Sequence, residues 1–150
     1  MPERNMKDIC AEAVSSVLER MFFTAPMGMS AEHAEGDSIE ARLVFRGRPC
    51  GEFRLRVSDC GARMLASGFL GEEEESLSRS QTEQVVCELA NMLCGSVVSQ
   101  LESEESIDLS APELVAVESA AKDGPGQPET WQSFELEAGL LSVALHLEAA

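Results

Sequence analysis

The chain has 150 residues, of which 44% are hydrophobic, so it can bury one substantial core but is short for two independent domains. We therefore expect a single domain over residues 1–150. Its 27 acidic and 11 basic residues give a formal net charge of −16, which argues against nucleic acid or an anionic membrane surface as a partner.

Residues 1–8 are mostly charged or polar, unlike a signal peptide, and no apolar stretch approaches the ~20 residues of a membrane span. A cytoplasmic protein without membrane insertion is expected.

The first third of the chain predicts a helix followed by a β-hairpin. Apolar residues recur at three- and four-residue steps from Lys7 to Phe23, which predicts an amphipathic helix. Residues 39–45 and 50–57 alternate as strands do, and Gly47 lies in the turn between them.

The middle of the chain predicts two further helices. Ser58 and Asp59 offer N-cap chemistry for a short helix that Gly71 would end, and the acidic run 72–75 is a solvated connector. The segment Ser80–Glu83 fits a capping box, with a long helix expected to follow to about Leu101.

The last third predicts mainly extended structure. Residues 107–117, interrupted at Pro112, predict irregular extended structure or a pair of short strands, and residues 122–128 predict a loop. Two alternating runs, 131–137 and 140–147, should form a terminal hairpin. A helix followed by a hairpin thus occurs twice, which favours an α+β fold with a largely antiparallel sheet and the helices packed on one face.

The long helix separates its side chains into two faces. One side carries apolar residues that should face the core: Val86, Leu89, Ala90, Leu93 and Val97. The opposite stripe is polar or small: Gln81, Gln84, Glu88, Asn91, Gly95 and Ser99. Asn and Gly each cost about 0.5–1 kcal/mol against Ala in a helix interior, and a purely solvated face has no need of both. The stripe is therefore a candidate docking surface, on which Glu88 and Asn91 point outward together.

The segment from Glu88 to Gly95 resembles the signature helix of the CheX/CheC/FliY family of chemotaxis phosphatases. Its pattern is a Glu, an Asn three residues later, often a Met next, and a Gly one turn on. The order of elements is also similar to that family over nearly the whole chain, which implies a CheC-like fold. Matching Met21 to Met92 places Val17 and Arg20 where a first Glu and Asn pair would be. A single pair per chain implies a CheX-type member.

The resemblance implies a phosphatase that hydrolyses the aspartyl phosphate of a CheY-like response regulator. Asn91 would position the attacking water and Glu88 would contact the receiver lysine. Gln84, Gly95 and Ser99 would contact the partner. The receiver would supply Mg²⁺, so no metal ligands or cofactor of its own are expected here. CheX-type members also tend to dimerise through sheet edges, and a homodimer is compatible with the terminal hairpin.

Two other functions compete with this one. A catalytically inactive, CheC-like binding module would dock a receiver domain or a flagellar switch component. A thiol sensor would use Cys87 and Cys94, but two turns of helix separate them by ~10 Å of rise, too far for an undistorted disulfide. The five cysteines are odd in number and contain no C-x-x-C pair, which disfavours a disulfide framework and a structural zinc site.

Overall fold

The structure is a computed structural model that describes residues 6–22, 24–30, 37–47, 50–100, 107–115 and 131–147. In chain order its elements are α1 (Met6–Met21), β1 (Gly28–Ser30), β2 (Ser38–Arg46), β3 (Gly51–Ser58), α2 (Asp59–Leu70), η1 (Glu74–Ser76), α3 (Arg79–Gln100), β4 (Asp108–Leu109), β5 (Glu113–Val115), β6 (Gln132–Glu135) and β7 (Leu140–Leu147).

The described strands form one 7-stranded sheet in the order β1-β6-β7-β3-β2-β4, with β5 also paired to β2. Every pairing is antiparallel. The two predicted hairpins, β2–β3 and β6–β7, are confirmed, and they join through their second strands, β3 and β7. The segment 107–117 contains a pair of short strands, β4 and β5, and both pair with β2.

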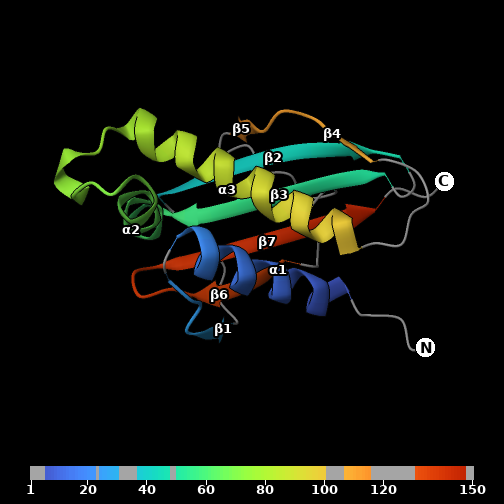
Figure 1. Cartoon of the computed structure of the whole chain (residues 1–150), viewed down its shortest axis with the longest axis horizontal. Coiled ribbons are helices and arrows are strands. Elements are labelled where there is room, and N and C mark those ends of the chain that lie inside the picture. The colour runs from blue at the N-terminus through green and yellow to red at the C-terminus, as the bar shows by residue number, and fades with distance from the viewer. Residues whose placement is uncertain are drawn as a thin grey trace.

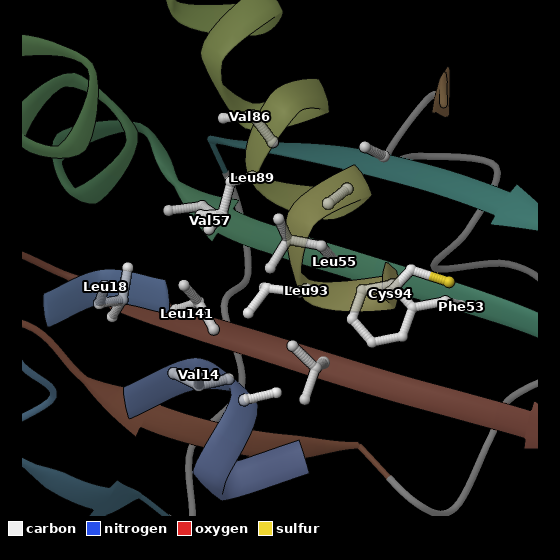
Figure 2. Close-up of a cluster of buried hydrophobic side chains, with 14 of the residues drawn as sticks. Val14, Leu18, Phe53, Leu55, Val57, Val86, Leu89, Leu93, Cys94 and Leu141 are labelled. Carbon is white, nitrogen blue, oxygen red and sulfur yellow. The ribbon is translucent and has the colours of Figure 1, made fainter. Parts of the chain in front are cut away.

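The helices lie on one face of the sheet, as expected (Figure 1). In Figure 2, Leu89 and Leu93 of α3 point toward Leu55 of β3, while Val14 and Leu18 come from α1. All five side chains are 1% exposed or less, so α1 and α3 share one hydrophobic core with the sheet. The α+β fold with an antiparallel sheet is thus confirmed.

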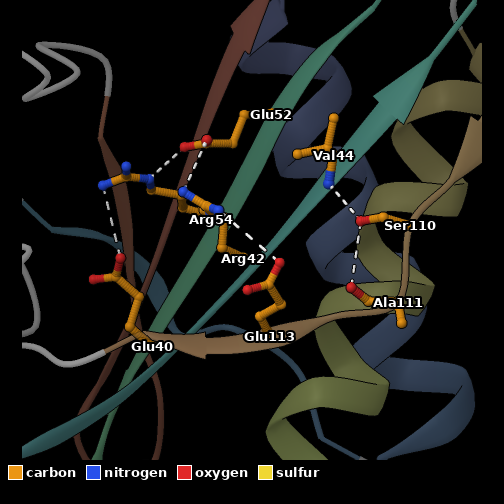
Figure 3. A network of polar contacts seen from close by, with 8 residues as sticks. All are labelled: Glu40, Arg42, Val44, Glu52, Arg54, Ser110, Ala111 and Glu113. Carbon is orange, nitrogen blue, oxygen red and sulfur yellow. Dashed lines mark hydrogen bonds and ion pairs between the residues drawn. The ribbon is translucent and has the colours of Figure 1, made fainter.

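The opposite face of the same strands carries charged residues, because side chains alternate along a strand. Glu40, whose side chain is fully buried, accepts a hydrogen bond from Arg56 Nε at 2.8 Å, and its Oε2 lies 3.8 Å from Arg54 Nη1. Arg54 also donates to Glu52 at 2.6 Å (Figure 3). Arg56 stacks over the Trp131 ring at 4.9 Å. Paired charges therefore take the place of an apolar layer on this face.

Several predictions about element ends are corrected by the structure. The capping box is formed by Ser78 and Gln81, not by Ser80–Glu83: Gln81 N donates to Ser78 Oγ at 3.1 Å and Ser78 N to Gln81 Oε1 at 2.8 Å. Both pairs fit the same motif, and α3 begins at Arg79, two residues earlier than an N-cap at Ser80 allows. Ser58 is the N-cap of α2 by position, but its hydroxyl accepts a hydrogen bond from Leu140 N at 3.0 Å instead.

The other end of α2 is as predicted, because Gly71 adopts φ +69° and its N–H bonds to Ser67 O. The strand β1 was not among the predicted elements. The predicted loop 122–128 and the helix end at Leu101 lie outside the described residues.

Candidate functional site

The helix α3 supports the candidate site from the core side. The five residues predicted to face the core are no more than 1% exposed: Val86, Leu89, Ala90, Leu93 and Val97. Thr82, Val85 and Cys94 are buried with them. Because one whole side of the helix is fixed against β2, β3 and α1, the backbone that carries the outward side chains is rigid.

The outward stripe is exposed where the candidate residues lie. Gln84, Glu88, Asn91 and Ser99 are exposed, whereas Gln81 and Gly95 are partly covered. Three residues of α-helix separate Glu88 from Asn91, which is about 4.5 Å along the axis and places both on the same side. A single partner surface could contact both side chains at once.

The side chains of Glu88 and Asn91 have no structural role in the described part of the chain. Of the two carboxylates on α3, Glu83 pairs with Arg79 at 3.2 Å. The side chains of Glu88 and Asn91 make no hydrogen bond or ion pair with any residue in the described part of the chain. A carboxylate accepts hydrogen bonds from a cation, and a carboxamide both donates and accepts, so together they can hold a cationic group and a water molecule.

Gly95 and Ser99 complete the stripe in different ways. A Cβ on Gly95 would meet only Leu109 Cδ1, at 3.9 Å, which is an ordinary contact. The fold does not need glycine there, whereas a partner that approaches the backbone closely would. The Ser99 hydroxyl donates to Ser96 O at 2.9 Å, so only its acceptor lone pairs face outward.

The matching positions on α1 carry no such pair. Val17 is half-buried and Arg20 is exposed. A valine cannot bind a cation as a carboxylate does, and an arginine cannot orient water as a carboxamide does. This supports a single candidate pair among the described residues of α1 and α3.

The thiols on α3 are poorly suited to redox sensing. Burial raises the pKa of Cys94 to about 12, with a smaller contribution from Cys10. Burial also raises the pKa of Cys87, followed by the negative charges of Glu83 and Glu88. A raised pKa keeps a thiol protonated at neutral pH, and the thiolate is the reactive form. These cysteines therefore lack the electropositive surroundings of a sensor.

A hollow of about 560 Å³ lies beside the candidate pair. Its lining includes Phe69 and Leu70 at the end of α2, Gln84 and Glu88 on α3, and Leu114 on β5. We call it the α3 hollow. Sequence reasoning missed it because three separate elements form it. The one signal in the sequence was a pair of apolar residues, Phe69 and Leu70, at the very end of a helix.

Two further features bear on what the described residues can do. They contain no group of three or more His, Cys, Asp or Glu side chains that could hold a metal ion. Their helices are also too short or too polar to cross a membrane.

The sequence profile of the family described as chemotaxis phosphatase CheX matches residues 39–135. No curated protein sequence matches the chain. Among solved structures, CheX from the CheX–CheY–BeF₃–Mg²⁺ complex of Borrelia burgdorferi is 18% identical, with a TM-score of 0.74 over 98% of this chain and 100% of that one.

Two other solved structures have the same fold. The chemotaxis protein CheX of Vibrio vulnificus is 18% identical, with a TM-score of 0.74 over 99% of each chain. FliY of Thermotoga maritima is 13% identical, with a TM-score of 0.61 over 98% of this chain and 92% of that one.

Proposed function

The chain belongs to the CheX family of chemotaxis phosphatases, and from this premise we propose that it hydrolyses the phospho-aspartate of a CheY-like response regulator, with Asn91 and Glu88 as the active pair. The observation that carries the proposal is that both side chains stand exposed, side by side and unpaired by any described residue, on a helix whose other face is fixed in the core. The complex of a relative with CheY, BeF₃ and Mg²⁺ supports a receiver domain as the partner.

Asn91 is proposed to position the attacking water. A carboxamide is too weak a base to take a proton from water, but its oxygen can accept a hydrogen bond and its NH₂ can donate one. Water held in line with the phosphorus loses less freedom on the way to the transition state. The water-orienting glutamine of a GTPase acts in the same way.

Glu88 is proposed to bind the lysine of the receiver's phosphorylation site. A charge-assisted contact between the carboxylate and the ammonium group fixes how the receiver sits on α3. Because Asn91 lies one helical turn away, this contact also sets where its carboxamide meets the phosphoryl group. Gln84, Gly95 and Ser99 extend the contact surface along the same stripe.

The remaining chemistry is proposed to come from the receiver. Its Mg²⁺ would neutralise the phosphoryl oxygens, so this chain would supply neither a metal nor a cofactor. We further propose that residues 1–150 form one phosphatase domain, which acts in the cytoplasm as a monomer or as a homodimer formed through a sheet edge. Nucleic acid and membrane insertion have no part in this function.

A second candidate is a binding module of the same fold without phosphatase activity. The similarity to FliY favours this binding module, because that similarity lies in the fold and not in phosphatase chemistry. Such a protein would dock a receiver domain or a flagellar switch component and leave the aspartyl phosphate intact.

The two candidates differ in the rate at which the receiver loses phosphate. Purified protein is mixed with a phosphorylated, Mg²⁺-loaded CheY-like receiver, and inorganic phosphate release is followed. A phosphatase shortens the lifetime of the phosphorylated receiver in proportion to the amount added. If the receiver decays at its own rate while still binding the protein, the phosphatase proposal fails and the binding module stands.

A further inference from the structure

The α3 hollow is a mostly apolar concavity beside the candidate pair. Leu70 and Leu114 are 41% and 48% exposed, and they are two of the few large hydrophobic side chains that the described residues leave so open. Glu88 belongs to both the hollow and the candidate pair. A partner that reaches Glu88 therefore lies at the edge of this apolar surface.

The walls of the hollow are held in place by the fold. The Phe69 ring stacks on Phe22 at the end of α1, with centroids 4.9 Å apart and planes 23° from parallel. A Cβ on Gly68 would lie 2.9 Å from Phe22 O, so these segments pack closely. On the α3 side, Val85 is 3% exposed. Little side-chain freedom would be lost when a partner covers such a surface.

The size of an ordinary protein interface places the hollow inside the receiver's footprint. A stable complex covers roughly 800 Å² on each partner, which corresponds to a circle of about 16 Å radius. Ser80, the lining residue on α3 that lies farthest from Asn91, is eight residues from Glu88, or about 12 Å along the helix. A receiver centred on Glu88 and Asn91 must therefore cover much of the hollow.

The polar edge of the hollow is acidic. Glu72 accepts a hydrogen bond from Gln81 Nε2 at 3.4 Å, and it begins an exposed run of four glutamates that continues to Glu75. Glu88 adds a carboxylate on the other side, and no described residue pairs with it. Arg79 is already engaged by Asp59 and Glu83, at 2.9 and 3.2 Å. The hollow thus suits apolar side chains flanked by basic ones.

We propose that the α3 hollow receives apolar side chains of the phosphorylated CheY-like receiver, next to the basic group that meets Glu88. The identity of this occupant rests on the proposed function. The hollow then supplies affinity, whereas Asn91 supplies chemistry. Docking is asymmetric along α3, since the apolar contact extends from Glu88 toward the end of α2 and away from Ser99.

The test measures binding separately from catalysis. A CheY-type receiver loaded with Mg²⁺ and beryllofluoride, which mimics the phosphoryl group without being hydrolysed, is titrated with wild-type protein and with Leu70→Ser and Leu114→Ser. Each substitution should raise Kd about three- to tenfold, because about half of a leucine side chain is lost from the apolar contact. Leu70→Met should restore most of the affinity.

Met27→Ser is the matched control, because Met27 is 67% exposed and precedes β1 at the far edge of the sheet. Its Kd should equal that of wild type, and all variants should melt at similar temperatures. Unchanged Kd values for both leucine variants would overturn the inference and leave the phosphatase proposal intact. Weaker binding by the leucine variants, with no phosphatase activity in the wild type, would support the hollow and refute the proposed function.

Discussion

At the scale of single residues, Glu88 is proposed to contribute binding rather than chemistry. Glu88→Gln keeps the shape of the side chain and removes its charge. We expect the KM for the phosphorylated receiver to rise about tenfold, because a charge-assisted hydrogen bond becomes a neutral one, with a smaller fall in kcat. Steady-state phosphate release at several receiver concentrations separates the two constants.

Glu19→Gln is the control for this change, since Glu19 is an exposed glutamate on α1. Like Glu88→Gln, it makes the net charge one unit less negative, but it does not alter α3. If both variants raise the KM to the same extent, the Glu88→Gln substitution acts only through the overall charge. The proposed role of Glu88 in binding the receiver lysine would then be wrong.

The residues of the candidate site could be predicted from the sequence better than any other part of it. The spacing of Glu88 and Asn91 along a helix placed both on the outward face, and the structure confirms that they are exposed. Their freedom from hydrogen bonds could not be predicted, because Glu83, on the same helix, is paired with Arg79. Which carboxylate of α3 is paired depends on how the fold places the charged side chains of α2 beside those at the start of α3.

At the scale of elements, α3 packs one side against the core and carries the proposed docking surface on the other. At Gly95, helix stability and the proposed docking favour different residues. Gly95→Ala should stabilise the protein by about 0.5–1 kcal/mol, because alanine favours helix and the added Cβ meets only Leu109 Cδ1 at 3.9 Å. If a receiver approaches the backbone there, the same methyl group should weaken phosphatase activity several-fold.

Chemical denaturation and phosphate release, measured on the same preparation, check this prediction. A gain in stability with unchanged activity would mean that the partner does not come close at Gly95. A loss of stability would mean that the packing around Leu109 is tighter than the structure indicates.

Elements with a clear hydrophobic period could be predicted from the sequence, while those defined by their neighbours could not. The helix α3 and the terminal hairpin have strong local patterns. The strand β1 is only three residues, Gly28–Ser30, with no alternation of its own, and it is a strand because β6 offers a free edge. The α3 hollow was missed for the same reason, since α2, α3 and β5 meet only in the folded chain.

At the scale of the whole molecule, the sheet separates an apolar face beneath the helices from a charged face on the other side. Glu40 lies on that second face, with Arg56 Nη2 2.7 Å from its carboxylate. Glu40→Gln should cost about 3 kcal/mol in stability, because it leaves Arg54 and Arg56, both mostly buried, without their shared countercharge.

Urea denaturation measures this cost, and Glu113→Gln is the control. Glu113 is 66% exposed and lies 4.0 Å from Arg42, so its loss should change stability by no more than about 0.5 kcal/mol. Because this network and α3 lie on opposite faces of the sheet, folded Glu40→Gln protein should keep its phosphatase activity. Equal stability of the two variants would show that the Glu40 cluster is not structural.

The proposed function depends on one pair on α3, in which Asn91 positions the attacking water and Glu88 binds the receiver lysine. The most direct measurement is the decay of a saturated complex between the protein and a phosphorylated, Mg²⁺-loaded receiver, for wild type, Asn91→Ala and Arg20→Ala. Arg20 is exposed at the matching position of α1. We expect Asn91→Ala to reduce the acceleration by about ten- to a thousandfold while binding the beryllofluoride-loaded receiver normally, and Arg20→Ala to behave as wild type. Full acceleration by Asn91→Ala would contradict the account.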